Sequence, residues 1–349
     1  MMTASHRPSR ERRIRGDGGF ILAATLWALA ALTVLAGYVS SVANADVERA
    51  QAQRQALQDE LDVRGTENTL IYLLATTRRS HRGMILEQEQ RFSEPGGAIL
   101  RHPGDGTVAM SGETYEGLGR VQFALQDERG LFGINSPGQP YLGLLLEHVG
   151  VRAVDVQRLM PLIADYIDMD NEISLGGAER YDYVRARRPA PPNWFMAGTP
   201  ELKRVLGFES VISASQWRRL RPLLTPRVQL GYNFNTMSPE AVAALVGGKE
   251  AAQLLLEERE EQVIRTLEEV TDLTGRLLRL DPDEMLIFPS PTVRVAVWPV
   301  GSTRRSILGL RLTAGGVTMP WRKEYRYSEP FEGRAGQALA ARTPLFRTD

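Results

Sequence analysis

Residues 18–45 read GGFILAATLWALAALTVLAGYVSSVANA and contain no charged residue. A helix built from this stretch is apolar on every side, and roughly 20 such residues suffice to span a bilayer. The acids Asp46 and Glu48 follow it, and five arginines precede it: Arg7, Arg10, Arg12, Arg13 and Arg15. An excess of arginine keeps its side of the membrane cytoplasmic. The sequence therefore predicts a single-pass membrane protein whose body is exported.

Three interpretations of this segment differ in how it is processed. A cleaved secretory signal would end at the small residues 43–45, but its apolar core would be only about 7 to 15 residues long. A plain membrane anchor would not be cut at all. In the third interpretation, Gly19 and Phe20 lie directly after the basic leader, and this junction is similar to that of a type IV prepilin. That similarity implies a cut between the two residues, which leaves the apolar helix on the mature chain.

The same helix is expected to continue well beyond the apolar run. Residues 46–79 contain no proline and one glycine, and their apolar residues recur at helical spacing among polar ones. We therefore predict one helix over residues 20–79, with a coiled coil as the less regular alternative. Its second half is amphipathic. We expect that half to pack partly on its own domain and partly on helices of other subunits, through Leu57, Leu61, Leu70 and Leu73.

The chain as a whole has a composition that supports an ordinary folded body behind the helix. Of its 349 residues, helix included, 43% are hydrophobic and 24% are charged, and 42 basic residues balance 42 acidic ones. This balance argues against a surface that binds polyanions. The chain contains no cysteine and can form no disulfide bond, so in an oxidising compartment only core packing or a bound metal could stabilise its fold.

Local patterns divide the body into two strand-rich blocks around a helical one. Alternating or β-branched stretches occur in residues 80–137 and again in residues 286–330, whereas residues 138–285 show helical periodicity. A tail, residues 331–349, follows. This order predicts an α+β fold: a small sheet domain into which a helical domain is inserted.

Three segments of the predicted insert share one pattern, in which a short helix ends at a glycine and a second helix follows. The glycines are Gly150, Gly207 and Gly247. Glycine is favoured just past a helix end because it adopts the left-handed conformation easily. Helix-hairpin-helix units that bind DNA use a similar turn, which makes a membrane-anchored DNA receptor of the competence type the alternative function. Such units usually carry a second glycine, and the charge balance favours packing units.

The acidic stretch of residues 165–183 is the most chemically distinctive part of the insert. If Asp168 is position one, then Asp170, Glu172 and Glu179 occupy positions three, five and twelve, which are ligand positions of a calcium loop. Ile173 occupies the position of the usual glycine, so a regular EF-hand turn is excluded. The carboxylates still form an oxygen-rich set that suits calcium better than zinc. The alternative is a solvated acidic loop that caps helices.

No group of residues indicates catalysis. The histidines His6, His81, His102 and His148 are scattered and lack the spacing of a metal site. We therefore predict an assembly protein that is not an enzyme.

Several of these motifs occur together in one known family. The chain resembles the K-type minor pseudopilins of type II secretion systems, whose motifs occur in the same order along the sequence. The matching parts are the Gly19–Phe20 junction, residues 165–183, Asn193, the helix before Gly207, and residues 233–239. The resemblance implies a type IV pilin-like fold. In that fold a long N-terminal transmembrane helix packs on a small antiparallel sheet, and a large helical (SAM-like) domain is inserted in the sheet.

The resemblance also implies a function and a cellular place. A protein of this family is a non-enzymatic subunit at the pseudopilus tip that supports export of folded proteins across the outer membrane. It is cut by prepilin peptidase after a leader, here residues 1–19, and methylated. It is held in the inner membrane, with its body in the periplasm of a Gram-negative bacterium. Its expected partners are the I- and J-type minor pseudopilins, without nucleic acid. Calcium, bound by acidic residues of the insert, is the expected cofactor.

Ala24 is the fifth residue of the predicted mature chain. Most pilins and pseudopilins carry glutamate there, which is thought to neutralise the amino terminus of a neighbouring subunit inside the membrane, where an unpaired charge is unfavourable. A subunit with alanine cannot make that contact to a subunit ahead of it. The resemblance and Ala24 therefore agree on a position at the tip.

Overall fold

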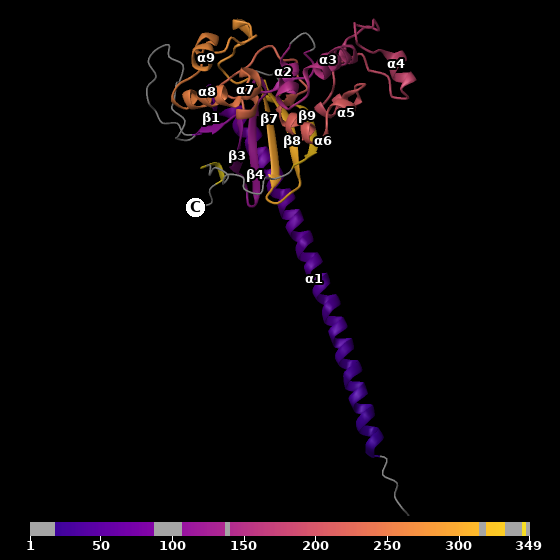
Figure 1. The fold of residues 1–349 in the computed structure, drawn as a ribbon. Helices are drawn as coiled ribbons and strands as arrows, with labels where there is room; N and C mark the ends of the chain where they lie inside the picture. The colour runs from indigo at the N-terminus through magenta and orange to yellow at the C-terminus, as the bar shows by residue number, and fades with distance from the viewer. Residues whose placement is uncertain (1–17, 87–106, 137–139, 314–318, 332–343, 347–349) are drawn as a thin grey trace, which may run out of the picture. The chain divides into compact units, whose positions relative to one another are not determined.

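A computed structural model describes residues 18–86, 107–136, 140–313, 319–331 and 344–346 (Figure 1). The predicted leader lies almost entirely outside these residues, and so do the side chains of Gly19 and Phe20 and most of the predicted tail. The chain divides into two compact units, Met1–Gln58 and Asp59–Asp349, which we describe separately.

The first unit contains the start of helix α1 (Gly18–Thr76), which confirms the predicted long N-terminal helix. Large apolar side chains between residues 21 and 42 are exposed to solvent rather than packed in a core. Within the described residues, α1 is the one helix that is long and apolar enough to cross a membrane. Its composition and exposure fit a single-pass anchor.

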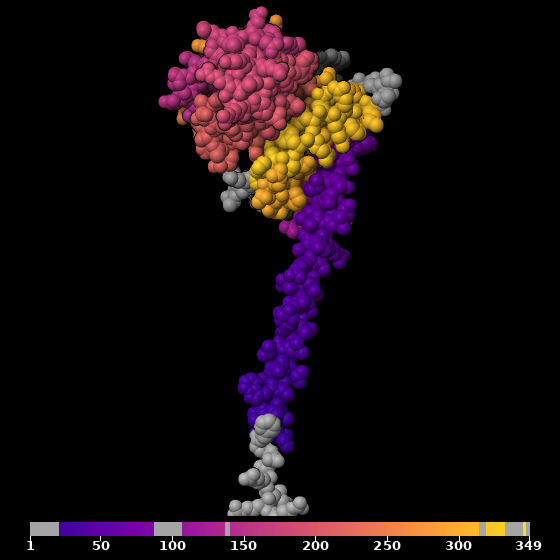
Figure 2. Space-filling model, turned by 90° about the vertical axis from the view of Figure 1, so that its right-hand side faces the viewer, coloured from indigo at the N-terminus to yellow at the C-terminus, as the bar shows by residue number. Residues whose placement is uncertain are grey.

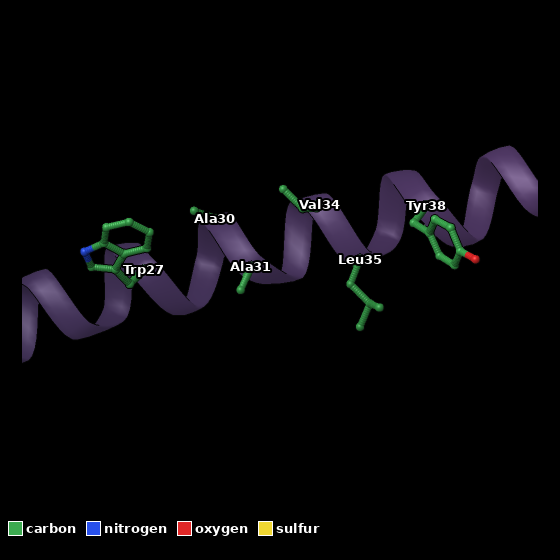
Figure 3. A pocket seen from close by; sticks show the side chains of 6 residues that line it. All are labelled: Trp27, Ala30, Ala31, Val34, Leu35 and Tyr38. Carbon is green, nitrogen blue, oxygen red and sulfur yellow. The ribbon is translucent and has the colours of Figure 1, made fainter.

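A shallow apolar hollow lies along this part of α1 (Figure 3). Ala30 and Ala31 lie between the large side chains of Trp27 and Tyr38, and Val34 and Leu35 complete the lining. All six residues recur at helical spacings of three and four, so they form one stripe. Small residues in such a stripe allow another helix to approach closely inside a bilayer.

The second unit is built on a five-stranded antiparallel sheet with the order β3-β4-β7-β8-β9. Its strands are β3 (Ser111–Glu116), β4 (Val121–Asp127), β7 (Thr292–Pro299), β8 (Arg304–Leu312) and β9 (Trp321–Pro330). A separate two-stranded sheet pairs β1 (Gly83–Ile85) with β2 (Thr107–Ala109). Strands β4 and β7 are neighbours in the sheet, although the whole helical insert separates them in sequence. Their pairing ends at Asp127 and Val293. The insert therefore leaves and re-enters the sheet at one end of two adjacent strands.

The last turns of α1 pack on one face of this sheet. Leu70 and Leu74 are buried in a core with Phe123, Leu125 and Leu308. Leu61 remains exposed and Leu73 is only partly buried against this core, so part of the amphipathic stripe stays open, as predicted. Ion pairs from the buried Glu67 to Lys323 and Arg326 hold the helix to β9.

The insert has its own large apolar core and is mainly helical. Its α-helices are α2 (Tyr141–His148), α3 (Ala153–Ile167), α4 (Arg180–Arg185), α5 (Phe208–Val211), α6 (Ala214–Leu220), α7 (Pro239–Val246), α8 (Lys249–Glu261) and α9 (Leu267–Thr274). Short 3-10 turns are η1 (Glu128–Gly130), η2 (Thr199–Arg204), η3 (Arg221–Leu223) and η4 (Pro282–Glu284), with η5 (Pro344–Phe346) near the end of the chain. Strands β5 (Phe132–Gly133) and β6 (Leu224–Thr225) pair in parallel. Figure 2 shows α3–α6, in magenta to salmon, gathered beside the yellow strand β9.

The three predicted helix–glycine–helix elements are present. Gly150, Gly207 and Gly247 follow α2, η2 and α7, with φ values of 91°, 80° and 78°. These left-handed conformations are easy for glycine and unfavourable for residues with a Cβ atom. The glycines therefore end helices, as the packing interpretation predicts.

A buried polar cluster, which we call the Asp127 joint, connects the sheet to the insert. Asp127 lies at the end of β4 with no exposed surface. Its carboxylate accepts hydrogen bonds from the backbone N–H groups of Arg129 and Ser290 and from the side chains of Thr236 and Asn233. The residues of the 233–239 motif thus bond to the sheet before Ser238 caps α7. Every acceptor atom of this buried carboxylate has a partner.

Candidate metal centre

The acidic loop, residues 168–179, connects the end of α3 to the start of α4. Helix α3 ends where Asp168 takes an extended conformation, and Glu179 is the residue before the first turn of α4. Asp165, in the last turn of α3, is fully buried, and its Oδ2 accepts a hydrogen bond from the Ser174 N–H at 3.1 Å. This bond folds the loop back over the helix end.

Glycine is favoured where the loop returns to α3. A Cβ atom on Gly177 would lie 1.9 Å from the Asp165 Oδ2 atom, so a larger residue fits only if the buried Asp165 side chain moves. The loop therefore closes against the Asp165 carboxylate. This close approach explains the glycine at position 177.

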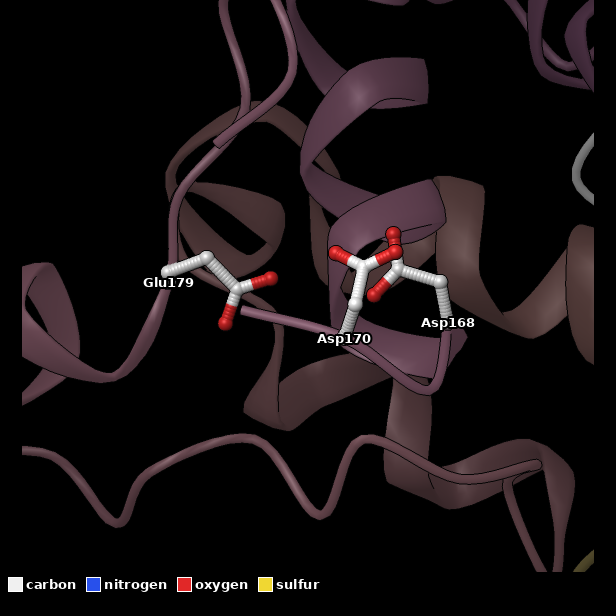
Figure 4. A group of neighbouring side chains, drawn as sticks. All are labelled: Asp168, Asp170 and Glu179. Carbon is white, nitrogen blue, oxygen red and sulfur yellow. The ribbon is translucent and has the colours of Figure 1, made fainter. Parts of the chain in front are cut away.

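Three carboxylates of the loop converge (Figure 4). One oxygen each of Asp168, Asp170 and Glu179 lies within 4.8 Å of the other two. Oxygens bound to one calcium ion at about 2.4 Å can be at most about 4.8 Å apart, so the three atoms can share one ion. Residues from the end of α3 and the start of α4 thus meet at one point.

The predicted ligand Glu172 lies outside this group. Its side chain is exposed, and its backbone N–H donates a hydrogen bond to the Asp170 Oδ1 atom at 2.8 Å. Glu172 therefore shapes the turn that presents Asp170. Its own role as a ligand stays a prediction.

Several oxygens of the site lack a hydrogen-bond donor although they are buried. They are the Asp165 Oδ1 and Asp168 Oδ1 atoms and both carboxylate oxygens of Glu179, a residue that is only 3% exposed. Buried carboxylate oxygens without a donor or cation are unfavourable. In Figure 4 the Glu179 side chain points toward the two aspartates. The group is therefore arranged as a set of ligands, and a cation would satisfy it.

The electrostatics of the site lead to the same conclusion. Burial raises the pKa of Asp168, and the neighbouring carboxylates Asp170 and Asp165 raise it further. Burial also raises the pKa of Glu179, with Asp168 as the next cause. Like charges at short range oppose ionisation, and a divalent cation would reverse that effect. Oxygen ligands without His or Cys fit calcium rather than zinc.

Sequence reasoning missed two supporting residues. Asp165 begins the acidic stretch but lies before the calcium-loop count, although its position three residues before Asp168 places both on one side of the helix end. The Asn193 side chain donates hydrogen bonds to the Asp170 backbone oxygen and to the Asn171 side chain. Asn193 is 22 residues or more from these partners, so no local pattern could reveal the contact.

Comparison with known proteins identifies a family model and a relative that are similar to this chain. Residues 124–226, which include the end of β4 and the acidic loop, match the family "Type II secretion system (T2SS), protein K". A curated relative, type II secretion system protein K of Pectobacterium carotovorum subsp. carotovorum, is 26% identical over 240 residues. The alignment covers 63% of this chain, which spans 66% of the length of the relative, slightly under two thirds.

A solved structure has a similar fold. It belongs to the crystal structure of the GspK–GspI–GspJ complex from the type 2 secretion system of enterotoxigenic Escherichia coli. The two chains superpose with a TM-score of 0.53 at 16% identity, over 80% of this chain and 99% of the other. This likeness confirms the predicted fold class.

Proposed function

We propose that the chain is a non-enzymatic minor pseudopilin at the tip of the pseudopilus, because residues 124–226 match the family of type II secretion system protein K and the fold is similar to that of a chain in the GspK–GspI–GspJ complex. There it would support the export of folded proteins across the outer membrane. The observation that carries this proposal is the position of the insert. The insert emerges at one end of the sheet, between Asp127 and Thr292, and a body of this size would obstruct a further subunit on that side.

The membrane half of α1 supports the same place in the assembly. Ala24 provides no carboxylate for the amino terminus of a subunit ahead, as a tip position requires. The hollow between Trp27 and Tyr38 offers a stripe for a neighbouring transmembrane helix. We propose that α1 anchors the protein in the inner membrane, with the body in the periplasm and the I- and J-type minor pseudopilins as partners.

We also propose that Asp168, Asp170 and Glu179 hold a calcium ion. The chemistry that the ion supplies is charge neutralisation and oxygen coordination. Asp168 is attached to α3 and Glu179 begins α4, so shared coordination would fix the acidic loop between two helices. Asp165 and Asn193 would hold that loop in place through Ser174 and Asp170. Calcium would then stabilise this part of the insert without taking part in a reaction.

Replacement of the insert by a tight turn tests its role as a cap. Because Asp127 and Val293 are paired, residues 128–292 can be replaced by a two-residue hairpin turn that preserves the β4–β7 ladder. We expect the variant to reach the membrane but to lose secretion and co-purification with the J-type partner. Ala24→Glu serves as a second variant, which should fold normally but change its place in the assembly. Normal secretion without the insert would contradict the proposal.

Intact-mass measurement tests the processing. Protein recovered from membranes should lack residues 1–19 and begin at Phe20. Gly19→Leu should block the cut, because the resemblance implies a peptidase that accepts only a small side chain there, whereas Gly18→Ala serves as a control. A mature chain that begins at Asp46 would instead identify a cleaved secretory signal.

A further inference from the structure

The acidic loop and its surroundings expose an unusual amount of apolar surface. Seven large apolar residues between positions 169 and 195 are exposed: Met169, Ile173, Leu175, Tyr181, Val184, Trp194 and Phe195. Leu175 is fully exposed, and the Tyr181 side chain is 73% exposed. Single exposed apolar residues are common, but a concentration within so short a stretch indicates an interaction site.

One contact joins two parts of this surface, and helical spacing relates two residues of a third. Asn193 bonds to the backbone of Asp170, which holds the adjacent ring pair of Trp194 and Phe195, 6.1 Å between centroids, near the acidic loop. Tyr181 and Val184 are three residues apart on α4, so they share one face of that helix. In Figure 1, α4 lies at the outer edge of the insert.

Arginines accompany the apolar side chains. Arg180, Arg185 and Arg187 are exposed, and none of them forms an ion pair with another described residue. Arg187 has a φ value of 56°, in the left-handed region that usually holds glycine after a helix. A side chain with a Cβ atom is unfavourable there. The fold thus keeps a cation at this position against a backbone preference for glycine.

We propose that this surface, residues 169–195, docks on an anionic phospholipid membrane when calcium is bound. The proposal rests on the calcium site proposed above, because the free carboxylates of the acidic loop would repel lipid phosphates. Asp168 is partly exposed and Asp170 is exposed, so two of the carboxylates that would hold the ion reach the surface of the loop. Calcium takes 6–8 oxygen ligands, and a phosphate oxygen is a suitable one.

Side-chain chemistry favours a lipid as the occupant. Tryptophan and tyrosine prefer the interface between headgroups and hydrocarbon, and protruding aliphatic side chains such as Leu175 can enter the acyl region. Exposed arginines are attracted to anionic headgroups. Once calcium neutralises carboxylates of the acidic loop, the exposed arginines and interfacial aromatic rings would complement a phosphate-bearing surface.

Flotation with vesicles tests the proposal on the full chain. The protein is reconstituted in nanodiscs of phosphatidylcholine and mixed with separate vesicles of phosphatidylethanolamine and phosphatidylglycerol, with calcium or with EGTA. Calcium binding to the same nanodiscs is measured by titration calorimetry. We expect calcium-dependent flotation with these vesicles and little with vesicles of phosphatidylcholine alone. Arg185→Glu with Arg187→Glu should lower the partition coefficient about tenfold or more, and Leu175→Ser should lower it severalfold.

Matched controls lie elsewhere on the insert. Leu277 is 88% exposed and Lys249 is exposed at the start of α8, so Leu277→Ser and Lys249→Glu should leave flotation unchanged. Calcium binding without flotation would overturn the lipid surface but leave the calcium site standing. Equal flotation in EGTA would overturn the role of the ion in docking. Absence of calcium binding would overturn both the calcium site and the lipid surface. If the wild-type protein does not float but the same substitutions abolish binding of a protein partner, the surface is a protein interface instead.

Discussion

Two groups of buried carboxylates in the body differ in how their oxygens are satisfied. At the Asp127 joint, one aspartate accepts hydrogen bonds from four groups of η1, the 233–239 motif and the segment before β7. In the acidic loop, Glu179 is nearly as buried. It caps the first turn of α4, but neither of its carboxylate oxygens has a donor at full hydrogen-bonding geometry. The same chemical group is fully hydrogen-bonded in one region and only loosely capped in the other.

The difference separates a structural role from a binding role. A buried carboxylate with a full set of donors stabilises the connection between the sheet and the insert, because each hydrogen bond to a charged acceptor is strong. Burial still raises the pKa of Asp127, and the hydrogen bonds from Ser290, Thr236 and Arg129 oppose that shift. A buried carboxylate beside others, only loosely capped, destabilises the fold until a cation arrives. Substitutions should therefore destabilise the protein at the Asp127 joint but not in the calcium-free acidic loop.

The largest effect is expected at Asp127. Asp127→Ala removes the acceptor shared by four donors and should lower the free energy of unfolding by about 3 to 5 kcal/mol, because buried donors are left without partners. Chemical denaturation of the body measures this loss. Asp170→Ala, which changes an exposed aspartate of the acidic loop, is the matched control and should change stability in calcium-free buffer by less than about 0.5 kcal/mol. Equal losses in both variants would remove the distinction between the regions.

The second prediction concerns calcium. If the three converging carboxylates bind it, calcium at a hundredfold excess over its dissociation constant should stabilise the folded state by about 2.7 kcal/mol. Glu179→Gln should abolish this response. It should not destabilise the calcium-free protein, since it removes one of several like charges. Thermal unfolding with calcium and with EGTA measures both effects.

Glu172 sharpens the same experiment. It occupies a ligand position in the sequence count but lies outside the converging group. Glu172→Gln should therefore keep most of the calcium response that Glu179→Gln loses. Loss of the response in both variants would show that Glu172 moves into the site when calcium binds.

Several features of the fold were predictable from sequence because they depend on local patterns. The apolar run determines α1, the alternating residues of 293–298 predict β7, and the glycines at positions 150, 207 and 247 end helices. The order of strand-rich and helical blocks was sufficient to infer that a helical domain interrupts a sheet. These inferences need no knowledge of long-range contacts.

Contacts between distant residues could not be predicted in this way. Asn233 belongs to a segment that the sequence identified only through a family resemblance, yet it donates a hydrogen bond to Asp127, 106 residues earlier. The acidic spacing identified Asp168, Asp170 and Glu179, but not the exclusion of Glu172 or the support from Asn193. A turn without the expected glycine at Ile173 follows its own path, so counting positions does not determine which carboxylates converge.

His81, whose backbone oxygen accepts a hydrogen bond from the Asn233 side chain of the Asp127 joint, provides a third, intermediate effect. Burial, with Arg82 and Arg265 as further causes, lowers the pKa of His81 to about 4. A histidine in the unfolded chain has a pKa of about 6.5, so below that pH the unfolded state binds a proton that the folded state does not bind. The free energy of unfolding therefore falls as the pH falls. Between about pH 7 and about pH 5 this group should lower stability by about 2 kcal/mol. Denaturation of the wild type and His81→Leu at both pH values isolates the difference, which should be absent in the variant.

The smallest effect is expected at the outer edge of the acidic region, where two residues other than glycine have positive φ. Arg187→Gly should stabilise the body by up to about 1 kcal/mol. Glycine relieves the strain of the left-handed conformation, and we expect this gain to exceed the cost of the greater entropy that glycine gives the unfolded chain. Asn193, at φ 48°, is the matched position, but its side chain bonds to the Asp170 backbone, so Asn193→Gly should destabilise instead. Chemical denaturation resolves the two signs. Stabilisation by both changes would mean that the Asn193 hydrogen bonds contribute little to stability. Destabilisation by Arg187→Gly would instead show that the Arg187 guanidinium makes a contact important for folding and is not available to a partner.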